Sequence, residues 1–267
     1  MALRFLVVDA YDRAGREALR RAGCTEAGVL YERVLREKRP EAAIEIAFPG
    51  DGAAEFPDGL SAFDGFVWTG SSLNVHVAGD ARVGRMIELC RAAFEAGVPQ
   101  FGSCFAAQLA VTTAGGACAR SPKGREFGIS RDITLNEAGG AHPLFAGKAS
   151  RFDALTSHED EIATLAPGVE VLASNAWSAV QAVAVRHAAG SFWALQYHPE
   201  YDLREVARLS TLRAAQLIEQ GHFQDEGAAR AWAAELEAAH QGAPAAAPWQ
   251  SDGIPEIENW IRAQVEV

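Results

Sequence analysis

The sequence is short of positive charge. Its 267 residues include 24 lysines and arginines against 35 aspartates and glutamates, which gives a formal net charge of −11 at pH 7. Non-specific binding to nucleic acid or to an anionic membrane surface depends on clusters of lysine and arginine. The composition therefore speaks against both kinds of partner, although it leaves room for a local basic pocket that accepts a small acid.

The chain also lacks long apolar runs and paired cysteines. No stretch approaches the roughly 18 apolar residues that indicate a transmembrane helix, and the apolar segment within residues 1–10 is too short for a secretory signal. Four cysteines lie far apart, with neither a C-x-x-C pair nor the Cys/His spacing of a metal site. We therefore expect a cytoplasmic protein without a disulfide framework and without a metal. The cysteines are Cys24, Cys90, Cys104 and Cys118.

Two nucleotide-binding signatures are absent as well. There is no G-x-x-x-x-G-K-[ST] loop, and no G-x-G-x-x-G follows a strand-like run. We therefore expect no nucleotide on this chain, and nothing else in the sequence calls for a cofactor. The sequence does supply 49% hydrophobic and 22% charged residues, as in ordinary globular proteins. Its length fits one large domain, with or without an appendage.

Strand-like and helical patterns alternate over the first half of the chain. This order predicts βαβ units, hence an α/β fold with a mainly parallel, doubly wound sheet. The expected strands are Arg4–Val8, Ala43–Phe48, Phe66–Trp68 and Val98–Gly102, and the expected helices are Gly15–Ala22, Val83–Ala96 and Phe105–Ala114.

The middle of the chain, from about Ala117 to Ala194, changes to short strand-like pieces. This pattern favours a β-rich insertion on the parallel sheet over further βα repeats, and a helix is expected to follow over Leu203–Glu219. The expected strands of the insertion are Ile129–Leu135, Arg151–Leu155, Val169–Ala173, Ala179–Val185 and Ser191–Leu195.

After Gly221 the composition shifts again. Asp225–His240 is rich in alanine and glutamate and predicts a helix, whereas Gly242–Pro248 reads as a linker. Ile254–Val267 carries apolar residues at helical spacing, and we expect that apolar face to dock on its own domain rather than on a partner. The predicted division is a domain at 1–222 and a helical C-terminal extension at 223–267.

Cys104 differs from the other cysteines in its position. It follows the strand that ends at Gly102 and precedes helix-forming residues from Phe105 onward. A nucleophile on such a strand-to-helix turn is exposed at the carboxyl edge of the sheet, and a helix N-terminus favours the thiolate over the thiol. By itself the pattern leaves two interpretations open, a catalytic cysteine and a buried structural one.

A potential base and its orienting acid occur later, in the segment His198-Pro199-Glu200. Pro199 restricts His198 to an extended conformation, and in extended chain His198 and Glu200 project to the same side. The carboxylate can then orient the imidazole, which can serve Cys104 as general base and acid. An ordinary turn is the alternative reading of the segment, and the cysteine turn earlier in the chain makes that alternative weaker.

These motifs together resemble the class I (triad) glutamine amidotransferases, and in particular a GMP synthase-like amidotransferase domain standing alone. The resemblance rests on Gly102–Gln108 for the cysteine motif and Tyr197–Glu200 for the Tyr-His-Pro-Glu motif. Trp68–Val75 is similar to the family's glycine-rich turn, Leu155–Asp160 to its Ser-His-x-Asp segment, and Gly124–Gly128 to its Gly-x-Glu-x-Gly stretch. The motifs occur in the family's order, and the family implies a flavodoxin-like sheet.

The resemblance implies a Cys-His-Glu triad that cleaves the side-chain amide of glutamine or of a related γ-glutamyl compound through a thioester. Cys104 would be the nucleophile, His198 the acid and base, and Glu200 the residue that orients His198. The backbone N–H groups of Phe105 and of Gly70 or Ser71 would form the oxyanion hole. Contacts to the glutamyl group would come from Gln108, Ser157 and His158.

Two departures from the family pattern concern the expected pocket wall. Ala106 stands where the family usually has glycine, and Ser71-Ser72 stands where it often has Gly-Pro. These changes make amide hydrolysis a safer expectation than glutamine as the sole substrate. The Ala106 departure and the extra tail lean toward a free-standing γ-glutamyl hydrolase.

Several alternatives remain open at this point. The chain could be a glutaminase subunit that supplies ammonia to a separate synthase, since it carries no Ser-Gly-Gly-x-Asp-Ser signature of its own. It could also be a catalytically altered binding protein, or an acyl-transfer homologue that uses Cys, His and Glu. A small γ-glutamyl compound is the expected partner, and the sequence leaves a homo-oligomer open.

Overall fold

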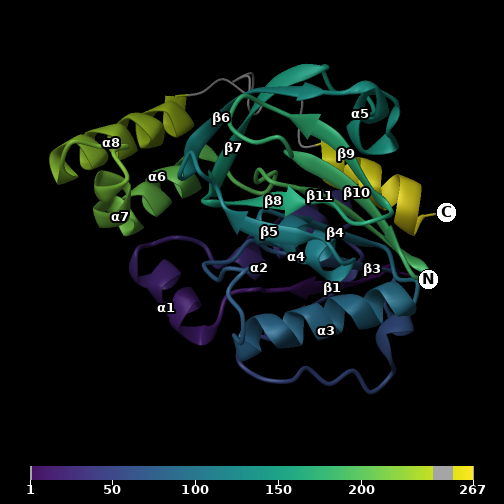
Figure 1. Ribbon diagram of the computed structural model, residues 1–267. Coiled ribbons are helices and arrows are strands. Elements are labelled where there is room, and N and C mark those ends of the chain that lie inside the picture. Colours follow the sequence, from purple (N-terminus) through teal and green to yellow (C-terminus); the bar gives the residue numbers. More distant parts are fainter. Residues whose placement is uncertain (1, 243–254, 267) are drawn as a thin grey trace.

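The computed structural model describes residues 2–242 and 255–266, in which a nine-stranded sheet forms the centre (Figure 1). Five strands run parallel, in the spatial order β2, β1, β3, β4 and β11. The sheet continues from β11 through antiparallel neighbours β10, β9, β6 and β7, while β5 and β8 form a separate two-stranded ribbon. The α/β class is therefore confirmed. The strands are β1 (Arg4–Val8), β2 (Ala43–Ala47), β3 (Gly65–Trp68), β4 (Gln100–Ser103), β5 (Ala117–Arg120), β6 (Glu126–Leu135), β7 (Arg151–His158), β8 (Asp160–Thr164), β9 (Val169–Ser174), β10 (Ala182–His187) and β11 (Gly190–Leu195).

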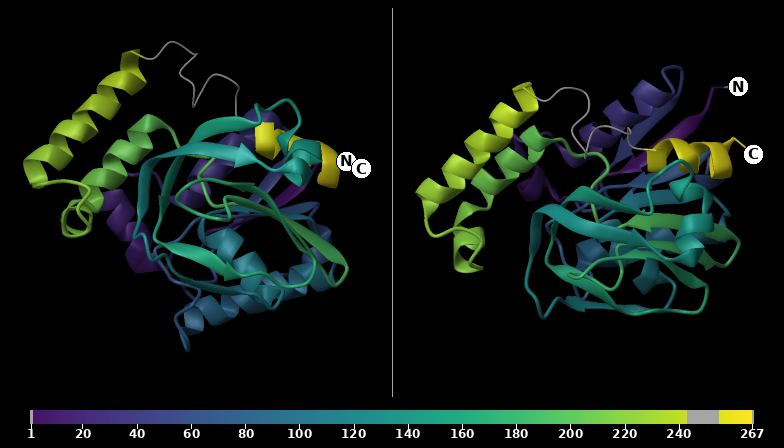
Figure 2. Two further views of the ribbon diagram at one scale, coloured as in Figure 1. Left: turned by 45° about the horizontal axis from the view of Figure 1, so that its top comes forward. Right: turned by 90° about the horizontal axis from the view of Figure 1, so that it is seen from above.

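Helices cover the sheet on both faces, and a helical group of α6, α7 and α8 lies at one end of the molecule (Figures 1 and 2). Aspartate side chains at the N-caps of α1, α3 and α6 accept backbone N–H groups of the first helical turn, which fixes where these helices begin. The helices are α1 (Arg13–Arg21), α2 (Ala27–Lys38), α3 (Ala81–Glu95), α4 (Phe105–Thr113), α5 (Glu137–Ala141), α6 (Leu203–Leu212), α7 (Ala214–Glu219), α8 (Glu226–Gly242) and α9 (Pro255–Trp260), with short turns η1 (Leu60–Ala62), η2 (Pro143–Phe145) and the π-helical η3 (Ile261–Val265).

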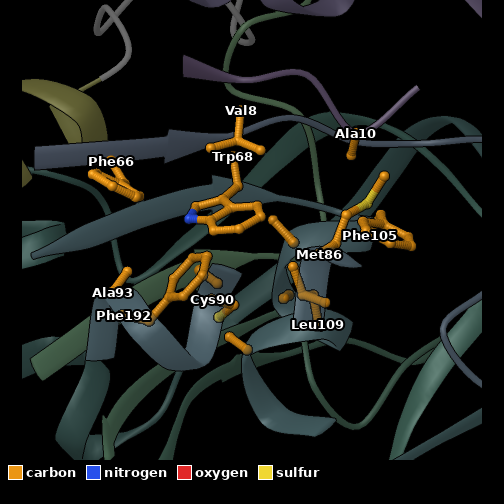
Figure 3. Packing of buried hydrophobic residues seen from close by; sticks show 14 of the residues in the cluster. Val8, Ala10, Phe66, Trp68, Met86, Cys90, Ala93, Phe105, Leu109 and Phe192 are labelled. Carbon is orange, nitrogen blue, oxygen red and sulfur yellow. The ribbon is translucent and has the colours of Figure 1, made fainter. Parts of the chain in front are cut away.

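The core has two layers because the central strands bury both faces. Along β1, Leu6 and Val8 point into the layer under α3 and α4, whereas Phe5 and Val7 point into the layer under α2 and α9. Figure 3 shows the first layer, where Trp68 lies among side chains of α3, α4 and β11. This packing holds the carboxyl ends of β3 and β4 in fixed positions, and the site is built there.

The helices differ from the expectation in several places, and α5 is one helix that was not predicted. Helix α2 has no counterpart among the helices predicted from sequence, although Tyr31 and Leu35 bury one face of it against the sheet. The helix expected over Leu203–Glu219 is broken at Arg213, whose backbone leaves the helical region (φ −102°, ψ 11°). No proline or glycine marks that break.

Helix α9 packs into the same core as the sheet. The side chains of Ile257, Trp260 and Ile261 are fully buried, and the indole of Trp260 lies 6.0 Å from the ring of Phe5. A Cβ atom at Gly65 would come within 2.7 Å of this indole, so the close approach depends on a glycine there. Most of the linker expected at Gly242–Pro248 lies outside the described residues, and Gly242 itself ends α8.

Replacing Trp260 with alanine is expected to lower the free energy of unfolding by about 3–5 kcal/mol, because it empties a fully buried site. Denaturant unfolding of the variant measures this loss. Arg262→Ala on the following turn is the matched control, since 71% of that side chain is exposed. Equal stability of the two variants would show that the C-terminal segment does not contribute to the core.

Candidate active site

Cys104 occupies a strained turn between β4 and α4. Its backbone has φ 55° and ψ −106°. Residues other than glycine rarely adopt this conformation, which costs on the order of 1–3 kcal/mol. Two features hold the turn: the Cys104 N–H donates to the carbonyl of Leu195 at 2.7 Å, and Gly102 leaves no room for a Cβ atom against Trp68 and Ala106. The turn places the thiol at the N-terminus of α4.

His198 and Glu200 form a buried hydrogen-bonded pair beside Cys104. The Nδ1 atom of His198 lies 2.7 Å from Oε1 of Glu200, and the imidazole lies near Cys104, because a Cβ atom at Gly70 would come within 2.8 Å of the His198 ring and 3.6 Å of the Cys104 Cβ. Because Nδ1 is engaged by the carboxylate, Nε2 is the nitrogen left to face the sulfur. The structure thus brings the three residues of the predicted triad together.

Neighbouring side chains fix the pair from two directions. The hydroxyl of Ser103 donates to Oε1 of Glu200 at 2.9 Å, and the ring of Tyr201 stacks on the imidazole at 3.9 Å with an interplanar angle of 1°. The backbone N–H of His198 donates to the backbone carbonyl of Leu155 at 2.8 Å, which ties this segment to β7. The imidazole therefore has little freedom to rotate away from Cys104.

The charge on His198 is stabilised by its surroundings. Burial opposes the imidazolium, but the Glu200 carboxylate and the nearby Cys104 side chain outweigh it and raise the pKa of His198 to about 9. Glu200 and Cys104 both favour the protonated ring, so the imidazole is a proton donor near neutral pH. A nucleophilic side chain and a proton donor then lie at one site.

The residues predicted to supply the oxyanion hole lie close to Cys104. Phe105 begins α4, where the first N–H groups have no partner within the helix. At Gly70 a Cβ atom would come within 2.8 Å of the His198 ring and 3.6 Å of the Cys104 Cβ, so the β3 turn passes close to both. The hydroxyl of Ser71 donates to the carbonyl of Ala10 at 2.7 Å and holds that turn in place. Ser71 and Phe105 both line the pocket described next.

A pocket of about 140 Å³ opens beside Cys104. Ser71 and Ser72 line it, as expected from their departure from the family pattern, but Ala106 does not. Ala106 is fully buried in the core under the turn, where its methyl group faces Gly102. The expectation that Ala106 forms part of the pocket wall is therefore wrong. The other lining residues are Leu73, Asn74, Cys104, Phe105, Gln108, Arg125, Ser157, His158, Glu159, Asp160, Arg213 and Gln216.

The three residues expected to contact the substrate take different positions. Gln108 lines the pocket while its Nε2 donates to the carbonyl of Asp160 at 3.1 Å. The backbone carbonyl of Ser157 lies 3.8 Å from the Cys104 sulfur, and the Ser157 hydroxyl accepts a hydrogen bond from Arg213. His158 has both ring nitrogens engaged, Nε2 with Glu126 at 2.8 Å and Nδ1 with the carbonyl of Asp160 at 3.0 Å. Its ring is thus committed to positioning these strands and is not available to a ligand.

Sequence reasoning missed several residues of the pocket. Arg125 and Asp160 lie inside segments that resemble the family's motifs, where a charged residue is a usable signal. Asn74, whose amide donates to Asp160 Oδ2 at 2.6 Å, could have been found in the same way. Arg213 gave no signal, because it reaches the pocket through the break between α6 and α7.

Metal and membrane features can be assessed for the described ranges only. Within residues 2–242 and 255–266, no three histidine, cysteine, aspartate or glutamate side chains cluster so as to hold a metal ion. None of the helices in those ranges has both the length and the apolar character needed to cross a bilayer.

Comparison with known proteins places the chain in a family. Residues 45–210 match the family profile of class I glutamine amidotransferases. The chain is 33% identical over 226 residues, 83% of its length, to a γ-glutamyl-L-1-hydroxyisopropylamide hydrolase of a Pseudomonas species, of which the match covers 76%. It is 42% identical over 106 residues to a GMP synthase of Thermomicrobium roseum, but this match covers 40% of the chain and only 18% of the synthase.

Solved structures agree on the fold. A glutamine amidotransferase from Thermotoga maritima superposes with a TM-score of 0.71 at 15% identity over the whole of both chains. One from Methylobacillus flagellatus gives a TM-score of 0.67 at 13% identity, over 98% of this chain and 94% of that one. With the strained cysteine turn, the buried histidine–glutamate pair and the profile match taken together, the chain belongs to the class I glutamine amidotransferase family.

Proposed function

We propose that this protein is an amidohydrolase that cleaves the γ-glutamyl amide bond of a small γ-glutamyl compound through a thioester on Cys104. The observation that carries the proposal is the buried pair of Glu200 and His198, 2.7 Å apart, which lies next to Cys104 and the pocket that Cys104 lines. The family relationship and the γ-glutamyl amide hydrolase relative support the choice of substrate.

In the first half of the reaction the Cys104 thiolate adds to the γ-carbonyl carbon. The negative charge on the carbonyl oxygen is met by the N–H groups of Phe105 and of Gly70 or Ser71, and one such donor is typically worth about 2.7–4 kcal/mol. The imidazolium of His198 gives its Nε2 proton to the departing nitrogen as the carbon–nitrogen bond breaks. The amine leaves and a γ-glutamyl thioester remains.

In the second half a water molecule loses a proton to His198 Nε2 and adds to the thioester carbonyl. The carbon–sulfur bond then breaks, which releases glutamate and restores the Cys104 thiolate and the imidazolium. Glu200 keeps the ring in the required tautomer throughout. Gln108 and the backbone of Ser157 and His158 would contact the glutamyl group, since all three line the pocket.

We further propose that the protein acts without a synthase partner. The γ-glutamyl amide hydrolase relative aligns with 83% of the chain, whereas the GMP synthase alignment covers 40%. In this proposal residues 1–222 form the amidohydrolase domain and residues 223–267 an extension, and the protein works in the cytoplasm on a small molecule. A glutaminase that supplies ammonia to a separate synthase is the second candidate, favoured by the GMP synthase relatives.

A substrate panel separates the two candidates. We expect the purified chain to hydrolyse γ-glutamyl alkylamides and γ-glutamyl peptides with a higher kcat/KM than glutamine, measured as release of glutamate and of the amine. Glutamine hydrolysis that exceeds every other member of the panel would favour the ammonia-supplying role. Absence of turnover of all members would contradict amide hydrolysis itself.

A further inference from the structure

Arg213 is a cation of the pocket that the proposed chemistry leaves without a role. It lies where α6 ends and α7 begins, and the change of backbone direction there brings its side chain to the pocket that contains Cys104. The guanidinium donates to the Ser157 hydroxyl and, at 3.4 Å, to the hydroxyl of Tyr11. Both acceptors are neutral groups.

The other cation and the acids that line this pocket are already paired. Arg125 lies 2.6 Å from Glu159 and 3.3 Å from the Gln220 amide oxygen. Oδ2 of Asp160 accepts from Asn74 at 2.6 Å and lies 3.0 Å from the His76 ring. Among the described residues, no carboxylate comes within 4.0 Å of a nitrogen of Arg213, in contrast to its neighbour Arg125.

A guanidinium has five N–H donors in a planar fork that matches a carboxylate. Among the described residues, the Arg213 guanidinium donates only two hydrogen bonds to side chains, one to Ser157 and one to Tyr11. A partly buried cation without an acid costs free energy that an anionic ligand would recover. A γ-glutamyl compound always offers one carboxylate, at its α-carbon, and offers a second when the amine that leaves is an amino acid.

We propose that Arg213 is the carboxylate receptor of this pocket and determines specificity, so that the substrate is a γ-glutamyl compound held by a carboxylate against the Arg213 guanidinium. The proposal rests on the proposed function and adds the substrate chemistry that the site prefers. The carboxylate has two sources, the glutamyl α-carbon or the departing amino acid, and both present the same group to Arg213.

Two matched substrate pairs identify the source. γ-Glutamyl-glycine and γ-glutamyl-methylamide differ only in the carboxylate of the departing amine, whereas γ-glutamyl-methylamide and its α-carboxamide differ only at the α-carbon. We expect the wild type to favour the carboxylate in one pair by about 10- to 100-fold in kcat/KM, the range for a charge-assisted hydrogen bond. In Arg213→Gln that ratio should fall toward one, mainly through KM, while the other pair keeps its ratio.

A conservative variant and a control on the same helix complete the design. Arg213→Lys keeps the charge without the fork and should retain part of the preference, and its melting temperature shows whether the site tolerates substitution. Arg204→Gln removes an arginine of α6 whose side chain is 51% exposed and lies 3.8 Å from Glu237. This control should leave both substrate ratios unchanged.

Two results would overturn the proposal. One is a wild type that shows no preference in either pair. The other is an Arg213→Gln variant that lowers kcat/KM for all substrates by the same factor, keeps both substrate ratios, and reacts more slowly with iodoacetamide at Cys104. That result would mean that Arg213 only supports the thiolate.

Failure of the proposed function would be seen separately. If the wild type cleaves none of the four compounds, each compound is tested for its ability to protect Cys104 from iodoacetamide. If the carboxylate-bearing member of a pair protects Cys104 in the wild type but not in Arg213→Gln, the protein binds the carboxylate without hydrolysing these amides. Equal protection by both members of each pair overturns it.

Discussion

Replacing Cys104 with alanine is expected to reduce hydrolysis of γ-glutamyl amides by a factor on the order of 10⁵–10⁶, because no other group can form the thioester. The thiol lies at a strained turn against the Ser157 carbonyl, and Cys104 is the only cysteine among the described residues that line the pocket. Steady-state release of glutamate from a γ-glutamyl amide measures the loss, with thermal unfolding to show that the fold is kept.

The control for this experiment is Cys24→Ala. Burial raises the pKa of the Cys24 thiol to about 12, so this cysteine is an inert neutral group at physiological pH. The variant should keep the activity of the wild type. Loss of activity in Cys24→Ala equal to that in Cys104→Ala, or retention of activity in Cys104→Ala, would contradict the assignment of the nucleophile.

Replacing Glu200 with glutamine is expected to lower kcat by about 10⁴-fold, as for other triads whose orienting acid becomes an amide. The amide keeps the size of the side chain but removes the charge that favours the imidazolium, and it can hold the ring in the wrong tautomer. Ser103→Ala removes only the hydrogen bond to Glu200 Oε1. Its effect should be about tenfold, the equivalent of one ordinary hydrogen bond.

The pH profile provides a second readout for Glu200→Gln. In the wild type the pKa of His198 is raised to about 9, so the proton donor is present at neutral pH and kcat/KM falls as the pH rises through about 9. Without the Glu200 carboxylate, burial dominates and the pKa of His198 falls, which moves the alkaline limb to lower pH. An alkaline limb that stays in place would mean that Glu200 does not act through the imidazole.

The sequence was sufficient to predict the parts of the site that depend on local chain geometry. A small-residue turn between a strand and a helix made Cys104 a candidate, and the proline after His198 indicated an extended segment that carries Glu200 on the same side. The family resemblance then assigned the triad. The α/β class followed from alternating periodicities, because buried strands and amphipathic helices leave different patterns. These are short-range effects, and the described structure brings the three residues together.

What could not be predicted depends on contacts between distant segments. Arg213 looked like one more charged position in a continuous helix, and only the break between α6 and α7 directs it to the pocket. Ala106 was expected at the pocket wall because it stands where the family usually has glycine two residues after the cysteine, whereas the tight turn rotates it into the core. The His158 ring was expected to contact substrate, but its Nε2 atom is hydrogen-bonded to Glu126 of the neighbouring strand.

Labelling by a glutamine-analogue electrophile tests the central claim most directly. The protein is treated with a diazoketone analogue of glutamine, and the mass and position of the adduct are determined by peptide mass spectrometry. We expect one adduct per chain, on Cys104, at a rate that falls when a γ-glutamyl amide is added as competitor. Absence of label on Cys104, or label spread equally over Cys24, Cys90, Cys104 and Cys118, would contradict a mechanism through a thioester on Cys104.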